Sequence, residues 1–138
     1  MKKLVMDSNA LIALFDGDSA IAEMMSRAER ILIPAVVLGE VRLGFNGTKR
    51  SRQAEAALES LLDRPNVEVL PVSADTGSFY VSVMTYLKKS GHPIPMNDVW
   101  IAAGVLETGS ALLSRDAHFD HIPMISRFEK LDCSAHDI

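Results

Sequence analysis

Cysteine, long apolar runs and excess positive charge are all scarce in this chain of 138 residues. Its single cysteine, Cys133, cannot form a disulfide within the chain, which is typical of a protein from a reducing cytoplasm. No apolar run approaches the ~20 residues that a helix needs to cross a bilayer. Asp7 and Asn9 interrupt the stretch near the N-terminus that would otherwise resemble a secretion signal. We therefore expect a soluble, cytoplasmic protein with no membrane contact.

The formal net charge is −4, which argues against a protein that binds nucleic acid with its whole surface. A nuclease is not excluded, because carboxylates clustered around metal ions lower the total charge while the bound cations supply a local positive field. Zinc is not indicated, because there is no cysteine pair and the histidines are scattered. We expect these histidines to be surface or loop residues: His92, His118, His121 and His136.

What is present is the composition of an ordinary globular domain, with 48% hydrophobic and 23% charged residues. The length fits a single domain, residues 1–138, which can bury roughly two thirds of its unfolded surface. Short apolar runs alternate with longer segments of helical periodicity, without repeats, linkers or low-complexity segments. This alternation predicts an α/β fold with parallel strands and helices on both faces. In such sheets, ligands bind at the carboxyl ends of the strands.

The expected elements follow from periodicity, capping residues and chain breakers. Pro34 is expected to open one helix, while Ser73 and Asn97 are expected to cap two others; Gly91 and Gly109 are expected to end those two. We predict strands at 3–6, 31–33, 67–70 and 111–113, with a short fifth at 124–125. We predict helices at 8–15, 18–29, 34–45, 49–63, 74–89 and 98–108.

Two aspartates stand where predicted strands end. Asp7 follows the first strand and Asp116 lies just past the fourth, so both belong to the edge of the sheet where ligands bind. Each is also explained equally well as a turn residue or a helix cap, since aspartate suits both roles. Asp98, in the first turn of the last helix, is favoured there by the helix dipole, and the same position keeps its carboxylate ionised.

Glu40 is harder to explain structurally. At 100° per residue it projects between Val36 and Gly44, on the apolar side of its predicted helix. An ionised carboxylate on an apolar face is costly unless it is paired or binds a metal. Arg42 is two residues away and does not face it on a helix. A salt-bridge partner elsewhere in the fold is the alternative.

Four acids from four separate elements would repel one another unless cations lie among them. Hard divalent ions such as Mg²⁺ or Mn²⁺ suit a site made of oxygen ligands completed by water and phosphate. The pattern therefore indicates a metal site formed by four acids: Asp7, Glu40, Asp98 and Asp116.

Around these acids the sequence resembles the PIN-domain family, and within it the VapC toxins of toxin–antitoxin pairs. The matching pieces, in family order, are residues 4–9 (LVMDSN), 34–40 (PAVVLGE), 97–103 (NDVWIAA) and 113–119 (LSRDAHF). Each piece is weak alone, but four in order over almost the whole chain are specific.

The resemblance implies an α/β/α sandwich with a central parallel sheet of four or five strands. It implies a pocket holding one or two Mg²⁺ or Mn²⁺ ions, with Asp7, Asp98 and Asp116 as the principal ligands. Glu40 would bind metal through water or orient the nucleophile. Asn9 and Ser114 match the polar residues that support the acids. Ser114 stands where many relatives carry threonine, and the hydroxyl is retained.

The resemblance further implies endonucleolytic cleavage of RNA by a metal-activated water, a homodimer, and inhibition by an antitoxin in a groove near the site. The apolar residues Leu38, Val41 and Phe45 are candidates for that groove, although core packing explains them equally well. Asp120 is an extra acid near the pocket edge, for which a cap or loop role is the simpler reading.

Four basic residues are candidates for contacts with the RNA backbone. Lys49, Arg50 and Arg52 follow Gly47, and Arg115 adjoins Asp116. For the first three, a solvated start of a helix is the alternative interpretation.

The rival functions lack essential residues or an explanation for the acids. A phosphohydrolase of the haloacid-dehalogenase type needs a second acid two residues after Asp7, where this chain has Asn9. A receiver domain needs an acidic pair near the first strand and a late lysine, and neither is evident. A PIN-like module that only binds RNA or protein would gain nothing from crowded carboxylates.

Overall fold

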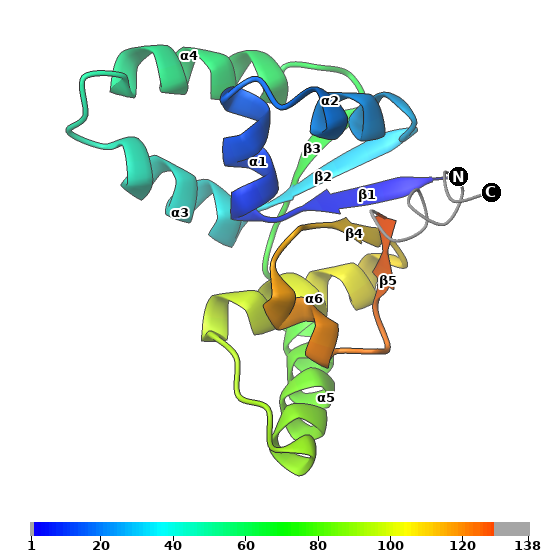
Figure 1. Cartoon of the computed structure of the whole chain (residues 1–138). Coiled ribbons are helices and arrows are strands. Elements are labelled where there is room, and N and C mark those ends of the chain that lie inside the picture. The colour runs from blue at the N-terminus through cyan, green and yellow to red at the C-terminus, as the bar shows by residue number, and fades with distance from the viewer. Residues whose placement is uncertain (1, 129–138) are drawn as a thin grey trace.

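The computed structural model describes residues 2–128, which form a central sheet covered by helices (Figure 1). The strands are β1 (Lys3–Met6), β2 (Arg30–Pro34), β3 (Val67–Leu70), β4 (Ala111–Leu113) and β5 (Ser126–Arg127). The helices are α1 (Ser8–Phe15), α2 (Ser19–Ser26), α3 (Ala35–Phe45), α4 (Ser51–Leu62), α5 (Ala74–Ser90) and α6 (Met96–Thr108). A short 3-10 helix, η1 (Ala117–His121), precedes β5.

All five strands are parallel and lie in the order β3-β2-β1-β4-β5. The chain moves from β1 to β2 and β3 on one side, and later to β4 and β5 on the other. Because crossovers between parallel strands are right-handed, this reversal places α1–α4 on one face and α5–α6 on the other (Figure 1). The predicted three-layer α/β/α sandwich is confirmed, with five strands. The order reverses between β1 and β4, where sheets of this class form a ligand-binding crevice.

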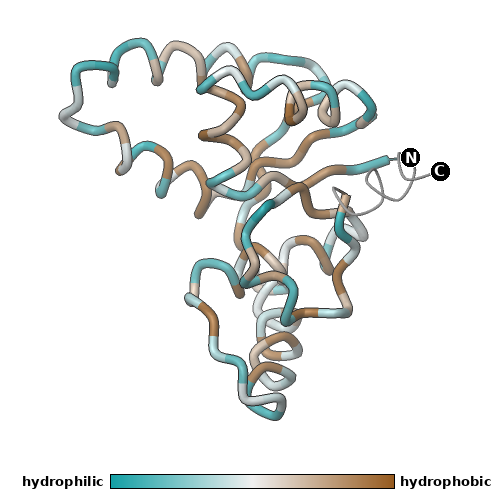
Figure 2. Tube along the Cα trace, viewed as in Figure 1, coloured by the Kyte–Doolittle hydropathy of each residue, from teal (hydrophilic) through white to brown (hydrophobic). Residues whose placement is uncertain are grey.

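The apolar interior fixes the elements that carry the acids. Residues 4–6 of β1 are fully buried, because β1 is the middle strand and both of its faces are covered. Figure 2 shows the hydrophobic residues concentrated along the central strands, whereas the α3–α4 connection is hydrophilic. Helix α6 is also enclosed: a Cβ added at Gly104 would lie 2.9 Å from Cδ2 of Leu70. The first turn of α6 therefore has a fixed position beside the sheet.

Several element ends differ from the predictions. The fifth strand is Ser126–Arg127 rather than 124–125, because pairing with β4 begins at Ser126. Helix α6 begins at Met96, so Asn97 lies inside its first turn and does not cap it. Pro34 ends β2 and precedes α3 instead of opening it, since its backbone is extended. The 3-10 helix η1 was not predicted, because five residues are too few to show a period.

Other local predictions hold. Ser73 is the N-cap of α5, and Gly91 and Gly109 end α5 and α6 in the left-handed conformation that glycine adopts without strain.

Helices α2 and α4 are shorter than the predicted 18–29 and 49–63. Cys133 and His136 lie outside the described residues. None of the described helices is both long and apolar enough to span a bilayer.

Candidate active site

Asp7 lies at the carboxyl end of β1, where the strand order reverses, and is only 3% exposed. One carboxylate oxygen accepts a hydrogen bond from the backbone N–H of Ala10 at 2.8 Å, so Asp7 is also the N-cap of α1. The other oxygen accepts a hydrogen bond from the Ser114 hydroxyl at 2.5 Å. The cap role and a role in the site therefore coexist in one side chain.

Ser114 connects two of the predicted acids. It follows β4, the strand next to β1, and is fully buried. Its hydroxyl donates to Asp7 and accepts a hydrogen bond from the backbone N–H of Asp116 at 3.0 Å. The supporting position predicted for Ser114 is consistent with these contacts, because the hydroxyl fixes both the Asp7 carboxylate and the turn that carries Asp116.

Asp98 and Asp116 meet at His118. Nδ1 of His118 lies 2.9 Å from Oδ2 of Asp98 and 3.2 Å from Oδ1 of Asp116. Asp116 caps η1 by accepting a hydrogen bond from the backbone N–H of His118 at 2.9 Å. His118 was expected to be a surface or loop residue. It is exposed, but it contacts two of the four acids. Its sequence signals are its position two residues after Asp116 and its place in the piece 113–119 that resembles the family.

Glu40 faces this cluster from α3. Its Oε1 accepts a hydrogen bond from the Ser8 hydroxyl at 2.7 Å, and its charge contributes to raising the pKa of Asp98. Glu40 is half-buried, and Arg42 pairs instead with Glu55 of α4, so it is not the partner of Glu40. Ser8 is a supporting residue that the sequence reasoning missed, although it adjoins Asp7.

The electrostatics of the site are those of crowded, partly desolvated carboxylates. Burial raises the pKa of Asp7 above its ordinary value of 3.8, and the charges of Asp116 and Asp98 add to this, against the hydrogen bonds from Ser114 and Ala10. Burial also raises the pKa of Asp98, against its hydrogen bond with His118. Within residues 2–128, no arginine or lysine forms a salt bridge with any of the four acids.

This donor set fits a divalent cation. Asp98, Asp116 and His118 each offer one ligand atom, and these atoms lie within 4.8 Å of one another. Asp7 lies outside that compact group. Its carboxylate is desolvated and lies beside Asp98 and Asp116, so it needs a counter-ion as much as those two acids do. A cation here would offset the burial of the charged carboxylates, which is the main cause of both raised pKa values, and would relieve the repulsion that adds to it.

The remaining predicted residues have other positions. Asn9 is exposed, and no hydrogen bond joins its side chain to another described residue. Lys49, Arg50 and Arg52 are exposed near the start of α4. Arg115 forms a two-pronged ion pair with Asp18, the N-cap of α2, at 2.6 and 3.3 Å, which lowers the pKa of Asp18.

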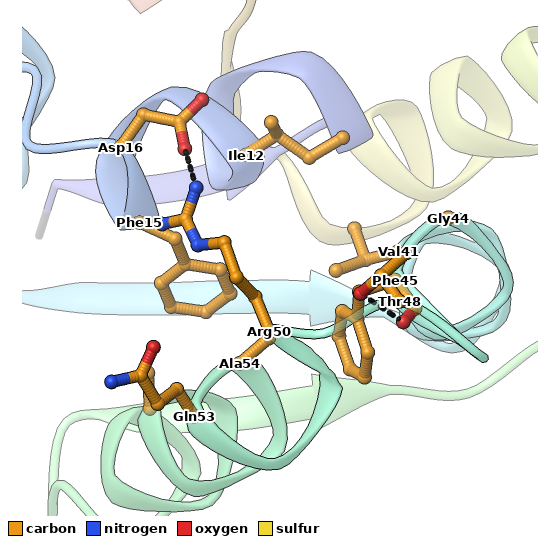
Figure 3. Close-up of a pocket in the computed structure, with 11 residues that line it drawn as sticks. Ile12, Phe15, Asp16, Val41, Gly44, Phe45, Thr48, Arg50, Gln53 and Ala54 are labelled. Atoms are coloured by element: carbon orange, nitrogen blue, oxygen red, sulfur yellow. Dashed lines mark hydrogen bonds and ion pairs between the residues drawn. The ribbon is translucent and has the colours of Figure 1, made fainter.

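An apolar groove lies on the same helices as Ser8 and Glu40. It has a volume of about 470 Å³ and runs between α1, α3 and α4 (Figure 3). Figure 3 shows Arg50 extending from the start of α4 toward Asp16 at the end of α1, with a separation of 4.0 Å. The lining residues include two of the three apolar residues that the sequence suggested for a groove, Val41 and Phe45. Leu38 and Val41 both belong to the buried core, and Leu38 does not line the groove.

Comparison with known proteins identifies relatives over most of the chain. "Ribonuclease VapC5" of Mycobacterium tuberculosis is 29% identical over 118 residues, covering 83% of this chain and 84% of the relative. "Ribonuclease VapC1" of Haemophilus influenzae is 29% identical over 116 residues, covering 81% and 85%.

Solved structures show the same fold. VapBC-1 from nontypeable Haemophilus influenzae matches with a TM-score of 0.78 at 26% identity, over 92% of this chain and 98% of that one. VapBC-5 from Mycobacterium tuberculosis matches with a TM-score of 0.72 at 27% identity, over 92% and 99%. The family model described as PIN domain matches residues 4–124, which include all four predicted acids. The chain therefore belongs to the PIN domain family.

Proposed function

We propose that this protein is a metal-dependent endoribonuclease and the toxin of a toxin–antitoxin pair. The observation that carries the proposal is the convergence of carboxylates from β1, α3, α6 and the β4–η1 connection, with raised pKa values at Asp7 and Asp98 and no arginine or lysine paired with them among the described residues. The names of its relatives, ribonucleases VapC5 and VapC1, support the reaction class.

Asp98, Asp116 and His118, together with Asp7, would bind the cation, and Mg²⁺ or Mn²⁺ suits the carboxylate-rich set. When bound, such an ion supplies an activated water and stabilises the charge that develops on the phosphate. Ser114 keeps the Asp7 carboxylate in place and fixes the turn before Asp116. Glu40, oriented by Ser8, would bind the ion through water or orient the attacking water.

The partners are proposed from the relatives and from surface chemistry. RNA is the substrate, and the exposed Lys49, Arg50 and Arg52 would contact its backbone near the groove, where Arg50 forms part of the lining. Arg115 is a weaker candidate, because Asp18 already pairs with it. A homodimer and a cytoplasmic location stay predictions from the family and from the single cysteine.

The antitoxin would occupy the groove between α1, α3 and α4. The structural relative VapBC-5 is a member of the VapBC family of toxin–antitoxin systems. The groove is lined mainly by apolar side chains with a charged rim, and an amphipathic helix laid into such a surface is a common mode of recognition. Glu40 lies one helical turn before Gly44 of the lining, so it is close to one end of the groove.

The test is cleavage of RNA by the purified protein, freed of any antitoxin. We expect cleavage with Mg²⁺ or Mn²⁺ that stops on addition of chelator. Asp7→Asn and Asp98→Asn should each reduce the rate at least a hundred-fold without unfolding the chain, since each removes a charge that binds the cation. Asp75→Asn, an exposed acid on α5, is the matched control and should cleave like the wild type. Undiminished cleavage by both site variants would overturn the assignment of these acids as the catalytic site. No cleavage by the wild type with either ion would favour a module that only binds RNA or protein.

A further inference from the structure

Arg127 is a nearly buried cation next to the site. Its side chain is 10% exposed, and its buried Nε has no hydrogen-bond partner among residues 2–128. Burying a guanidinium is costly unless its remaining donors are bound in good geometry. Apolar residues would fill the same place at the sheet edge with a smaller desolvation cost. Packing alone therefore does not explain why an arginine is present there, and the contacts of its two Nη atoms indicate a further role.

Those two contacts join Ser114, which directly follows β4, to Asp120 on η1. Nη2 of Arg127 donates to the backbone carbonyl of Ser114 at 2.9 Å. Nη1 donates to Oδ1 of Asp120 at 2.9 Å. The guanidinium also lies 5.9 Å from the ring centre of Phe119, a buried residue, at the outer limit of a cation–π contact.

Ser114 and Asp120 enclose the segment that carries Asp116 and His118. At its first end, the Ser114 hydroxyl binds Asp7 and the backbone of Asp116. At its far end, Asp120 lies on η1, the helix that Asp116 caps. A single planar guanidinium therefore fixes the distance between both ends of the segment. A lysine has one ammonium in place of this fork and does not reproduce both bonds in the same geometry.

We propose that Arg127 is a positioning residue of the metal site, acting through Ser114 and Asp120 to set the relative placement of Asp116 and His118. No hydrogen bond or ion pair joins it to the four acids within the described residues, so its effect is on geometry and not on chemistry. The inference rests on the proposed metal-dependent function. Groups that orient metal ligands in this way typically contribute about 10–100-fold to metal affinity.

The experiment measures Mn²⁺ binding directly, from the electron paramagnetic resonance of free Mn²⁺, on folded protein without RNA. Arg127→Met is expected to weaken binding about 10–100-fold, and Arg127→Lys to weaken it less. Asp120→Ala, at a side chain that is 49% exposed, removes one of the two anchors without disturbing the core and should weaken binding several-fold. This variant keeps the test valid if replacement of Arg127 prevents folding.

The control for a merely structural role is Glu107→Ala, which destabilises the α5–α6 pair far from the acids and should leave Mn²⁺ affinity unchanged. Wild-type affinity in folded Arg127→Met, or in Asp120→Ala and Arg127→Lys together, would overturn the positioning role while leaving the proposed function intact. Equal loss of affinity in Glu107→Ala would also overturn it. A wild-type protein that neither binds Mn²⁺ nor cleaves RNA would overturn the proposed function and this inference with it.

Discussion

At the scale of the residue, Asp7 performs two tasks that conflict in the absence of a cation. As N-cap of α1 it needs only a hydrogen-bond acceptor, which an amide oxygen would also provide. As a buried carboxylate beside Asp98 and Asp116 it has a raised pKa, so its ionised form disfavours folding. Functional sites commonly retain such locally unfavourable groups at the expense of stability.

We therefore expect Asp7→Asn to stabilise the metal-free protein at neutral pH while abolishing cleavage. A group whose pKa is raised in the folded state contributes stability that is complete below its unfolded value, 3.8, and is lost as the pH rises through the folded value. Thermal unfolding in chelator should show the melting temperature of Asp7→Asn rising relative to the wild type between about pH 4 and pH 7.

Two checks accompany that measurement. Asp75→Asn removes an exposed acid on α5 and reports the effect of deleting a charge alone. The pairing with Arg115 lowers the pKa of Asp18. The contribution of Asp18 to the stability of the protein is therefore lost only as the pH falls below 3.8, which is outside the pH range compared. A difference between Asp7→Asn and wild type that stays constant or reverses with rising pH would contradict the argument.

At the scale of the element, the enclosed helix α6 carries Asp98 in its first turn and is hydrogen-bonded to α5 near its other end. Thr76 of α5 is 2% exposed, and its hydroxyl donates to Oε1 of Glu107 at 2.7 Å. The same hydroxyl accepts a hydrogen bond from the Ser73 backbone N–H at 2.9 Å, which completes the start of α5. Tyr80 and Trp100 stack between the two helices with ring centres 4.1 Å apart.

Glu107→Ala should lower the free energy of unfolding by about 1–3 kcal/mol, because the buried Thr76 hydroxyl loses its acceptor. Cleavage by the folded protein should be unchanged, since nine residues of helix, about 14 Å, separate Glu107 from Asp98. Urea unfolding followed by the fluorescence of Trp100, the sole tryptophan, measures the first effect.

Glu107→Gln keeps an acceptor oxygen and should lose less than half as much stability. If the alanine and glutamine variants were equally destabilised, the charge of Glu107 and not its hydrogen bond to Thr76 would be the cause.

At the scale of the whole molecule, the apolar groove and the acidic site share α1 and α3. Ile12 and Phe15 line the groove from α1, the helix that Asp7 caps, while Val41 and Phe45 line it from α3, the helix of Glu40. An exposed apolar surface of this kind indicates an interaction site. A partner bound along these helices would block access to the acids without contacting most of them.

Ala57→Arg places a long charged side chain in the groove from the exposed face of α4. We expect it to weaken binding of the cognate antitoxin roughly ten-fold or more, equivalent to about 1.4 kcal/mol, and to leave RNA cleavage intact. Titration calorimetry with the protein encoded beside this chain measures the affinity.

Ala56→Arg is the matched control, because Ala56 is an exposed neighbour on α4 that does not line the groove. Tight binding by Ala57→Arg, or equal weakening by both variants, would place the antitoxin elsewhere.

Much of this fold is determined locally. The strands from residue 3 to residue 113 and the glycine ends of α5 and α6 were predictable, because periodicity and capping depend on neighbours within a few residues. The four acids could be selected for the same reason: Asp7 and Asp116 follow apolar strands, Asp98 begins a helix, and Glu40 interrupts an apolar helix face. Their catalytic roles stay predictions.

The contacts that complete the site were decided only by tertiary structure. Ser8 and Glu40 are 32 residues apart, Arg115 and Asp18 are 97 apart, and Arg127 and Ser114 are 13 apart. Each contact depends on the strand order and on which way a side chain points after the helices have packed, and no local period encodes either. For that reason the sequence by itself determined which groups are chemically unusual, while packing alone decided that His118 meets two acids and that Arg115 meets Asp18.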